Sequence, residues 1–429
     1  MRVIFTCVTV LALSGVPASA ASLQPPQTVG ARPVLATAAA AGGAGSFAFV
    51  ARQNDGLLGA VRRRASLSWE TRELAMRADY QLRDPQIVID DRGVVTALWA
   101  GRVPHPALFA ARAQAGSGFG APRIVARLND ASGARPRMIV LPSRQVLVVF
   151  ADRASGARSP MRLKTLLITE GRPSVVRDLG AEGSSPAIAR SGAGAILAYV
   201  AGALRCARGG CVPRPVRATL LDAGGRGTGA TVTVSANGVA WHSPPRVVGA
   251  GSRAVVSWVS SDGPAIVNHA FTREYRTRPL RARAARKPFP SSRGFGAPTL
   301  AVLPGGDLLG ANVDRDGQAE LTVALRGASW QPPTILGEAG GSTTRPLLET
   351  SRGGRALVVF ARPRGIGLGP TFDITAVERS PTGAITSTAI GTSLSTNSGS
   401  RLSMSVSPDD QAIVTWPGAT GGVDVVLRD

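Results

Sequence analysis

Histidine, cysteine and lysine are scarce in this 429-residue chain, and their scarcity excludes several chemistries. It has three histidines, three cysteines and two lysines. No Ser-His-Asp or Cys-His arrangement can be assembled from so few histidines by spacing, so no catalytic nucleophile stands out. No group of His and Cys has the spacing of a metal site. We therefore predict no catalytic residue, no metal ion and no cofactor.

Long hydrophobic runs and helical periodicity are also nearly absent. No stretch beyond the first twenty residues reaches the roughly 18 apolar residues that a membrane span needs. The pattern over Glu70–Leu82 does not decide between a short helix and an irregular strand. These absences favour an all-β chain without a membrane span.

The first twenty residues have the composition of a secretory signal peptide. Arg2 precedes a short apolar core, Val3–Leu13, and Ala18-Ser19-Ala20 is a small-residue cleavage site. We therefore predict a signal peptide over residues 1–20 and a secreted protein, periplasmic or extracellular, whose residues 21–429 form one domain.

Only two cysteines remain after cleavage, because Cys7 lies in the signal peptide. Cys206 and Cys211 are close in sequence, and cysteines in an oxidising compartment tend to pair. A two-thiolate metal site is the alternative, but no histidine or third cysteine lies near. We predict a Cys206–Cys211 disulfide.

The most informative stretch is Pro85–Trp99, which predicts two strands around a tight turn. Ile87 and Ile89 lie two residues apart and share one face of the first strand. Asp90-Asp91-Arg92-Gly93 is turn chemistry, and Val94–Trp99 is a mostly apolar second strand.

This hairpin recurs along the chain, usually with a leading proline. Copies begin at residues 33, 85, 136, 186, 245, 298, 346 and 402. Their mean spacing, about 53 residues, is close to the period of propeller blades, which are four-stranded sheets. The copies predict a β-propeller of eight four-stranded blades, with seven as the alternative.

The two ends of the chain predict how this ring closes. The last copy stops at its third strand, Val423–Leu427, and lacks a fourth. The N-terminal segment Leu23–Gly30 resembles Trp330–Gly337, which occupies a fourth-strand position. We therefore expect Gln24–Val29 to pair with Val423–Leu427, which would leave no free sheet edge.

The hairpin and a Phe-Gly-Ala-Pro turn together carry a family resemblance. The residues are Pro85–Trp99, Gly118–Pro122 and Gly294–Pro298. The chain resembles secreted bacterial propeller-type repeat proteins related to the BNR or sialidase-like superfamily. The strict Ser-x-Asp-x-Gly-x-Thr-Trp box is absent, so the resemblance implies the fold and leaves sialidase activity unsupported.

Positive charge dominates the composition. The formal net charge is +22, and arginine supplies almost all of the basic residues. One interpretation is affinity for polyanions such as acidic glycans or envelope polymers. The other is a compositional bias towards arginine, alanine and glycine, with the charge spread over a solvated surface.

The fourth and fifth copies carry the longest insertions and the densest arginine segment. From strand order we expect these loops to lie largely on one face of the ring. An aromatic side chain beside cations suits an acidic glycan. The candidate ligand-binding residues are Trp241, His242, Arg276, Arg278, Arg281, Arg283 and Arg286.

These features predict a secreted binding or scaffold protein for anionic glycans or envelope polymers. We expect a monomer that does not bind nucleic acid. The alternative hypothesis is a glycan-active enzyme, a sialidase-like hydrolase or a lyase, that uses carboxylates on the loop face.

Overall fold

The computed structural model describes most of the chain after residue 21. The described residues are 22–63, 66, 68–76, 82–102, 105–154, 159–170, 172, 174–202, 206–207, 210–211, 214–239, 244–262, 267–277, 280–289, 297–314, 316–339, 345–364, 371–394, 402–419 and 421–428. They form β-strands, with one-turn 3-10 helices at Gly43–Gly45 and Ala131–Gly133 and no α-helix. This confirms the all-β class.

No helix in the described ranges is long and apolar enough to cross a membrane. The predicted signal peptide lies outside these ranges.

Five of the antiparallel sheets have four strands each. Their members, sheet by sheet, are β1 (Gln27–Val29), β33 (Val423–Arg428), β32 (Ala412–Pro417) and β31 (Ser403–Val406); β2 (Val34–Gly42), β3 (Ser46–Gln53), β4 (Gly56–Arg62) and β5 (Glu70–Met76); β6 (Arg83–Ile89), β7 (Val95–Gly101), β8 (Ala107–Ala113) and β9 (Arg123–Arg127); β23 (Thr299–Val302), β24 (Leu308–Val313), β25 (Gln318–Ala324) and β26 (Thr334–Glu338); and β27 (Leu347–Thr350), β28 (Ala356–Arg364), β29 (Thr371–Arg379) and β30 (Ile385–Leu394). The ambiguous stretch after Glu70 therefore begins as strand β5.

A sixth, eleven-stranded sheet continues the same pattern. Its strands are β10 (Arg137–Val140), β11 (Val146–Arg153), β12 (Met161–Ile168), β13 (Val175–Ser191), β14 (Gly194–Ala201), β17 (Arg214–Leu221), β18 (Gly227–Val239), β19 (Arg246–Ala250), β20 (Arg253–Asp262), β21 (Val267–Thr277) and β22 (Leu280–Ala282). The first half of β13 pairs with β12 and the second half with β14. β18 joins β20 through the single pair Val239 and Ser260. A separate hairpin pairs β15 (Cys206–Ala207) with β16 (Gly210–Cys211).

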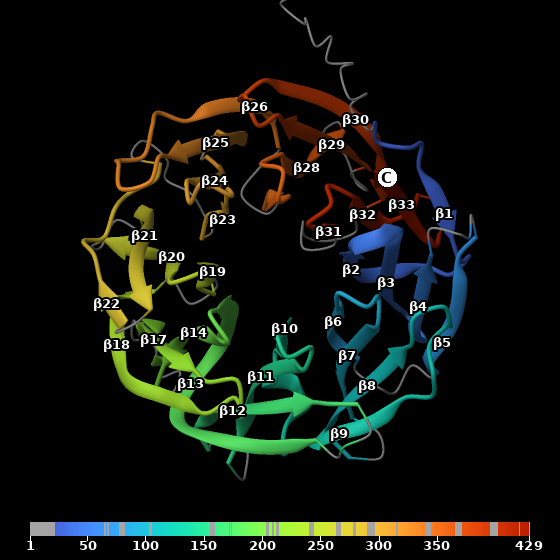
Figure 1. The fold of residues 1–429 in the computed structure, drawn as a ribbon, viewed down its shortest axis with the longest axis horizontal. Coiled ribbons are helices and arrows are strands. Elements are labelled where there is room, and N and C mark those ends of the chain that lie inside the picture. Colours follow the sequence, from blue (N-terminus) through green and yellow to red (C-terminus); the bar gives the residue numbers. More distant parts are fainter. Residues whose placement is uncertain are drawn as a thin grey trace, which may run out of the picture.

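The sheets are arranged around a common axis (Figure 1). Each four-stranded sheet has one strand nearest to the axis, and the eleven-stranded sheet has three. The innermost strands contact one another in the order β2, β6, β10, β13, β19, β23, β27 and β31, and β31 contacts β2. Strand β1 pairs with β33, with Thr28 opposite Asp424, and Gln24 N donates to Leu427 O at 2.7 Å. The predicted pairing of the two chain ends is confirmed.

Local turn chemistry explains the repeated hairpin. The Asp90 carboxylate accepts hydrogen bonds from the backbone N–H groups of Arg92 and Val94, and Gly93 has a φ of 79°. An aspartate that bonds its own turn and a glycine at positive φ suit a tight connection between antiparallel strands. This turn joins β6 to β7 where the sequence predicts it.

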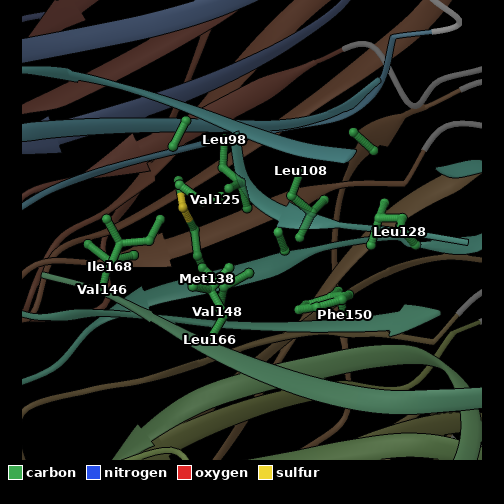
Figure 2. Packing of buried hydrophobic residues seen from close by; sticks show 14 of the residues in the cluster. Leu98, Leu108, Val125, Leu128, Met138, Val146, Val148, Phe150, Leu166 and Ile168 are labelled. Carbon is green, nitrogen blue, oxygen red and sulfur yellow. The ribbon is translucent and has the colours of Figure 1, made fainter. Parts of the chain in front are cut away.

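Apolar side chains between neighbouring sheets hold the ring together. In Figure 2, side chains such as Leu98 on β7, Leu108 on β8 and Val125 on β9 meet Met138 on β10 and Phe150 on β11. Alternate residues of each middle strand point to opposite neighbours, so both faces of the strand are covered. This explains why the middle strands read as nearly continuous apolar runs.

Candidate functional site

Arginines gather where several innermost strands begin. Arg137 is the first residue of β10, Arg246 is the first residue of β19, and Arg345 lies two residues before β27. Arg135 precedes β10, and Arg214 is the first residue of β17. We call Arg135, Arg137, Arg214, Arg246 and Arg345 the axial arginine cluster. They come from segments up to about 200 residues apart, which the ring places at one end of its axis.

Electrostatics shows that these guanidinium groups act on one another. Burial, then the charges of Arg345 and Arg137, lower the pKa of Arg246 to about 9. Burial also lowers the pKa of Arg137, which is raised by Asp84 and lowered by Arg135. The pKa of Arg214 is lowered by burial and by Arg135. The like charges therefore form a connected series, with Asp84 as an acidic neighbour.

The hydrogen bonds of four members of the cluster go to neutral groups. Arg135 Nη1 donates to Ser185 Oγ at 3.0 Å, and Arg246 Nη1 donates to Thr299 Oγ1 at 2.5 Å. The first contact joins two parts of the eleven-stranded sheet, and the second crosses from β19 to β23 of the next sheet. They orient the guanidinium groups and leave their charge uncompensated.

Arg214 and Arg137 follow the same pattern. Arg214 Nη1 donates to Ser184 Oγ and Gly202 O, and Arg137 Nη1 donates to Pro136 O. Within the described ranges, no carboxylate lies at ion-pair distance from Arg135, Arg137, Arg214 or Arg246. Partly buried cations without counterions are unfavourable, so an anion arriving at this site would be strongly attracted.

The backbone next to the cluster is strained in three consecutive repeat copies. Asp84, Arg135 and Ser185 have φ values of 47°, 40° and 52°. Each of them directly precedes the leading proline of its copy. Positive φ is unfavourable for a residue with a Cβ, and a following proline favours extended backbone instead. Such strain persists only where the surrounding structure holds the residue in place. It is found most often at functional sites.

Of the candidate residues predicted from the sequence, four lie in the described part of the chain, and all four are on or beside the β21–β22 hairpin. Arg276 is the penultimate residue of β21, Arg281 lies on β22, and the two pair across this hairpin. Arg283 and Arg286 continue along the outer edge of the same sheet, where Arg286 pairs with Thr272. Trp241, His242 and Arg278 lie outside the described residues.

The prediction that these loops share a face is wrong for the arginine segment. The end of β21 meets the β19–β20 turn, where Thr277 N donates to Ser252 O. Gly249, close to that turn, lies against Arg190 near the β13–β14 turn, so both turns are at the same end of the ring. The Cys206–Cys211 hairpin connects the other ends of β14 and β17. The sequence pattern missed the short strand β22, which returns the chain from the opposite end.

Cys206 and Cys211 are directly opposite each other in the β15–β16 ladder. Opposite residues of an antiparallel pair have Cα atoms about 4.5–5.5 Å apart, within the range that a disulfide spans. The backbone therefore has the register that the predicted bridge needs, and the bridge itself stays a prediction.

The axial arginine cluster was not among the sequence candidates, although a signal existed. Arginine flanks the leading proline in the third, fifth and seventh copies, at Arg135-Pro136-Arg137, Pro245-Arg246 and Arg345-Pro346. The intervening copies carry Ser184-Ser185-Pro186 and Pro298-Thr299 at this place. A search for charge at one fixed repeat position, in place of the densest charged segment, would have found it.

Comparisons with known proteins agree with the fold. No protein-family model matches the chain, and no curated protein matches its sequence. Among solved structures, a lectin from Burkholderia pseudomallei has a TM-score of 0.53 at 13% identity, covering 84% of this chain and 99% of that one. The polysaccharide lyase Uly1 has a TM-score of 0.53 at 8% identity, covering 80% and 97%. An ulvan lyase of polysaccharide lyase family PL25 has a TM-score of 0.48 at 12% identity, covering 81% and 93%. The lectin and Uly1 structures show a likeness in fold.

Proposed function

We propose that this protein is a secreted eight-bladed propeller that binds anionic glycans at the axial arginine cluster. The observation that carries the proposal is the group of guanidiniums at one end of the axis, several of them without a described carboxylate at ion-pair distance. Arginine presents a planar fork of donors that matches carboxylate and sulfate groups bidentately.

The blade number follows from dividing the eleven-stranded sheet. The two halves of β13 belong to successive blades, and β18 touches β20 through only one pair. Three blades then come from this sheet and five from the four-stranded sheets. The unbroken sequence of contacts among eight innermost strands supports this division.

Two observations favour a glycan over other anions. The predicted signal peptide would export the chain to a compartment that holds acidic polysaccharides. Solved structures of similar fold include a lectin and a polysaccharide lyase. In this proposal the glycan chain reaches the cluster from the end of the axis where the arginines gather.

Binding to acidic polysaccharides at different salt concentrations tests the proposal. At about 0.15 M salt, attraction between exposed charges is screened within about 8 Å, so a site-specific interaction should persist where diffuse attraction fades. We expect Arg137→Gln/Arg246→Gln to weaken binding to polygalacturonate at least about tenfold, since each lost charge-assisted hydrogen bond costs about 1.5–3 kcal/mol. Neutral dextran should not bind.

The matched control removes two charges elsewhere. Arg123 and Arg127 are exposed on β9, the outer strand of another sheet. Arg123→Gln/Arg127→Gln should change affinity less than twofold. Equal losses for the two double variants would mean that binding follows net charge, and the axial site would then be rejected.

A glycan-active enzyme remains the second candidate because a carboxylate stands beside the cluster. Asp84 acts on the charge of Arg137, and its own backbone is strained. An enzyme would release new reducing ends from the bound polysaccharide, and Asp84→Asn would abolish that release while leaving binding in place. Binding without new reducing ends favours the first candidate.

A further inference from the structure

A second cluster of arginines lines a pocket at the opposite end of the ring. The pocket lies between the β20–β22 strands and the turn that joins β25 to the following strand. It has a volume of about 560 Å³, and its charged lining residues are Arg253, Glu274, Arg276, Arg283 and Arg326. Sites for small ligands usually measure about 300–1,000 Å³, so the pocket is large enough for a sugar unit. We call it the rim pocket.

The charges of the rim pocket are unbalanced. Glu274 is its one acidic lining residue, and it is already engaged: Oε1 accepts from Arg253 Nε at 2.5 Å, and Oε2 lies 3.6 Å from Arg283 Nη1. Arg276 and Arg326 are exposed, and no carboxylate of the described ranges is at ion-pair distance from either. Four guanidiniums around one carboxylate leave a strong preference for an anion.

The pocket is held in shape from both neighbouring sheets. Arg253 Nη1 donates to Gly306 O at 3.2 Å, which ties β20 to the β23–β24 turn. The side chains of Arg253 and Glu274 are only 16% and 15% exposed. A largely buried ion pair of this kind fixes the position of the wall before any ligand arrives, which lowers the entropy cost of binding.

An aromatic side chain lies next to the arginines. A small recess shares Arg253, Glu274 and Arg283 with the rim pocket and continues to Trp330. Trp330 Nε1 donates to Thr272 Oγ1 at 3.2 Å, which fixes the indole. A fixed indole beside guanidinium groups offers an apolar surface next to the charges, as an acidic sugar requires.

We propose that the rim pocket binds a carboxylate- or sulfate-bearing sugar unit of a second glycan chain, so that one protein molecule bridges two chains. The bridging, but not the pocket itself, rests on the proposed axial site. The two sites are at opposite ends of β19, whose five residues span about 17 Å. Occupation of one site therefore leaves the other open.

Calorimetric titration with short probes tests both parts. The probes are a galacturonic acid tetramer and a sulfated tetrasaccharide, which separate the two anion chemistries. The wild-type protein should bind two equivalents of at least one probe. Arg276→Gln/Arg326→Gln should bind one, with the rim affinity reduced at least tenfold. Because both side chains are exposed, this variant should keep the wild-type unfolding temperature.

The other variants make the two proposals separable. Arg137→Gln/Arg246→Gln should also bind one equivalent, at the rim pocket, and the control Arg123→Gln/Arg127→Gln should bind two. With long polygalacturonate, only the wild type and the control should raise light scattering by cross-linking.

The following results would each contradict a specific part of the two proposals. A single equivalent in the wild type that the rim variant retains overturns the rim pocket and leaves the axial site standing. A single equivalent that only the rim variant loses overturns the axial site and the bridging while the pocket stands. Two equivalents without cross-linking overturn the bridging alone.

Discussion

Two interfaces between neighbouring sheets of this ring differ in the side chains that fill them: one is apolar and the other is largely polar. Where the β6–β9 sheet meets β10–β13, the contact is a continuous apolar cluster that includes Leu98, Met138 and Phe150 (Figure 2). Where β19–β22 meets β23–β26, the described residues form a smaller apolar cluster, which includes Val255, Leu300 and Leu308.

Polar side chains fill much of the second interface. Ser257 Oγ donates to Pro298 O, and Thr272 accepts from Trp330. Glu320 is only 6% exposed, and its Oε2 has no hydrogen-bond partner among the described residues. An apolar interface closes by itself because water leaves it, whereas a polar interface stays together only where its groups pair. The rim pocket lies at the edge of the polar interface, where the two sheets leave room for a ligand.

The largest effect is expected from the apolar interface. Phe150→Ala should destabilise the protein by about 3–5 kcal/mol, because a fully buried ring is lost and a cavity remains. Leu308→Ala in the polar interface should cost at the low end of about 2–5 kcal/mol, since fewer apolar neighbours surround it. Chemical denaturation of both variants measures the difference. Equal losses would contradict the contrast between the two interfaces.

Glu320 gives the polar interface a pH dependence. Burial, and then the charge of Asp314, raise the pKa of Glu320 to about 7. Between its usual value and 7, the folded protein binds the proton that the unfolded chain has lost, so unfolding free energy falls as pH rises through this window. A glutamine at this position does not titrate, so in Glu320→Gln the unfolding free energy should not fall through this pH window.

The variant should therefore gain stability relative to wild type between pH 5 and pH 8, by up to about 3 kcal/mol. Denaturation at the two pH values measures this gain. Asp91→Asn, at an exposed turn, is the control and should show no such trend. A constant difference between Glu320→Gln and wild type would show that Glu320 ionises normally.

We expect the axial arginine cluster to lower the stability of the protein without ligand, because its charges are held together for binding. The folded protein holds Arg246 with a pKa of about 9, so below that pH its charge opposes folding. Without ligand, Arg246→Gln should raise the unfolding temperature by roughly 2 °C, as expected for about 1 kcal/mol. Differential scanning fluorimetry measures the shift. A lower unfolding temperature would mean that the Thr299 hydrogen bond outweighs the repulsion.

The smallest effect is expected at the β15–β16 hairpin, which belongs to neither interface. Mass spectrometry of secreted protein should find no free thiol at Cys206 or Cys211. A bridge over so short a loop contributes at most about 2–3 kcal/mol, so Cys206→Ser/Cys211→Ser should speed proteolysis of this loop and leave global unfolding nearly unchanged. Complete alkylation without a reductant would contradict the bridge.

The sequence by itself determined the repeated hairpins, their spacing and the closure, although it missed the short strand β22. Turn residues such as Asp90 and Gly93, and apolar alternation around them, act over a few residues, so each hairpin can be recognised locally. The pairing of β1 with β33 was predictable because one copy lacked a strand and a spare segment existed at the other end.

Only the tertiary structure determined which charged side chains lie close together in space. Arg137, Arg246 and Arg345 are separated by about a hundred residues each, and they become neighbours because the ring brings the residues beside the leading prolines of successive copies to one end of its axis. The dense segment from Arg276 to Arg286 drew attention in the sequence, yet it lies at the opposite end of the ring, where β21 ends and β22 begins. Density along the chain measures proximity in sequence, whereas electrostatic attraction depends on distance in space.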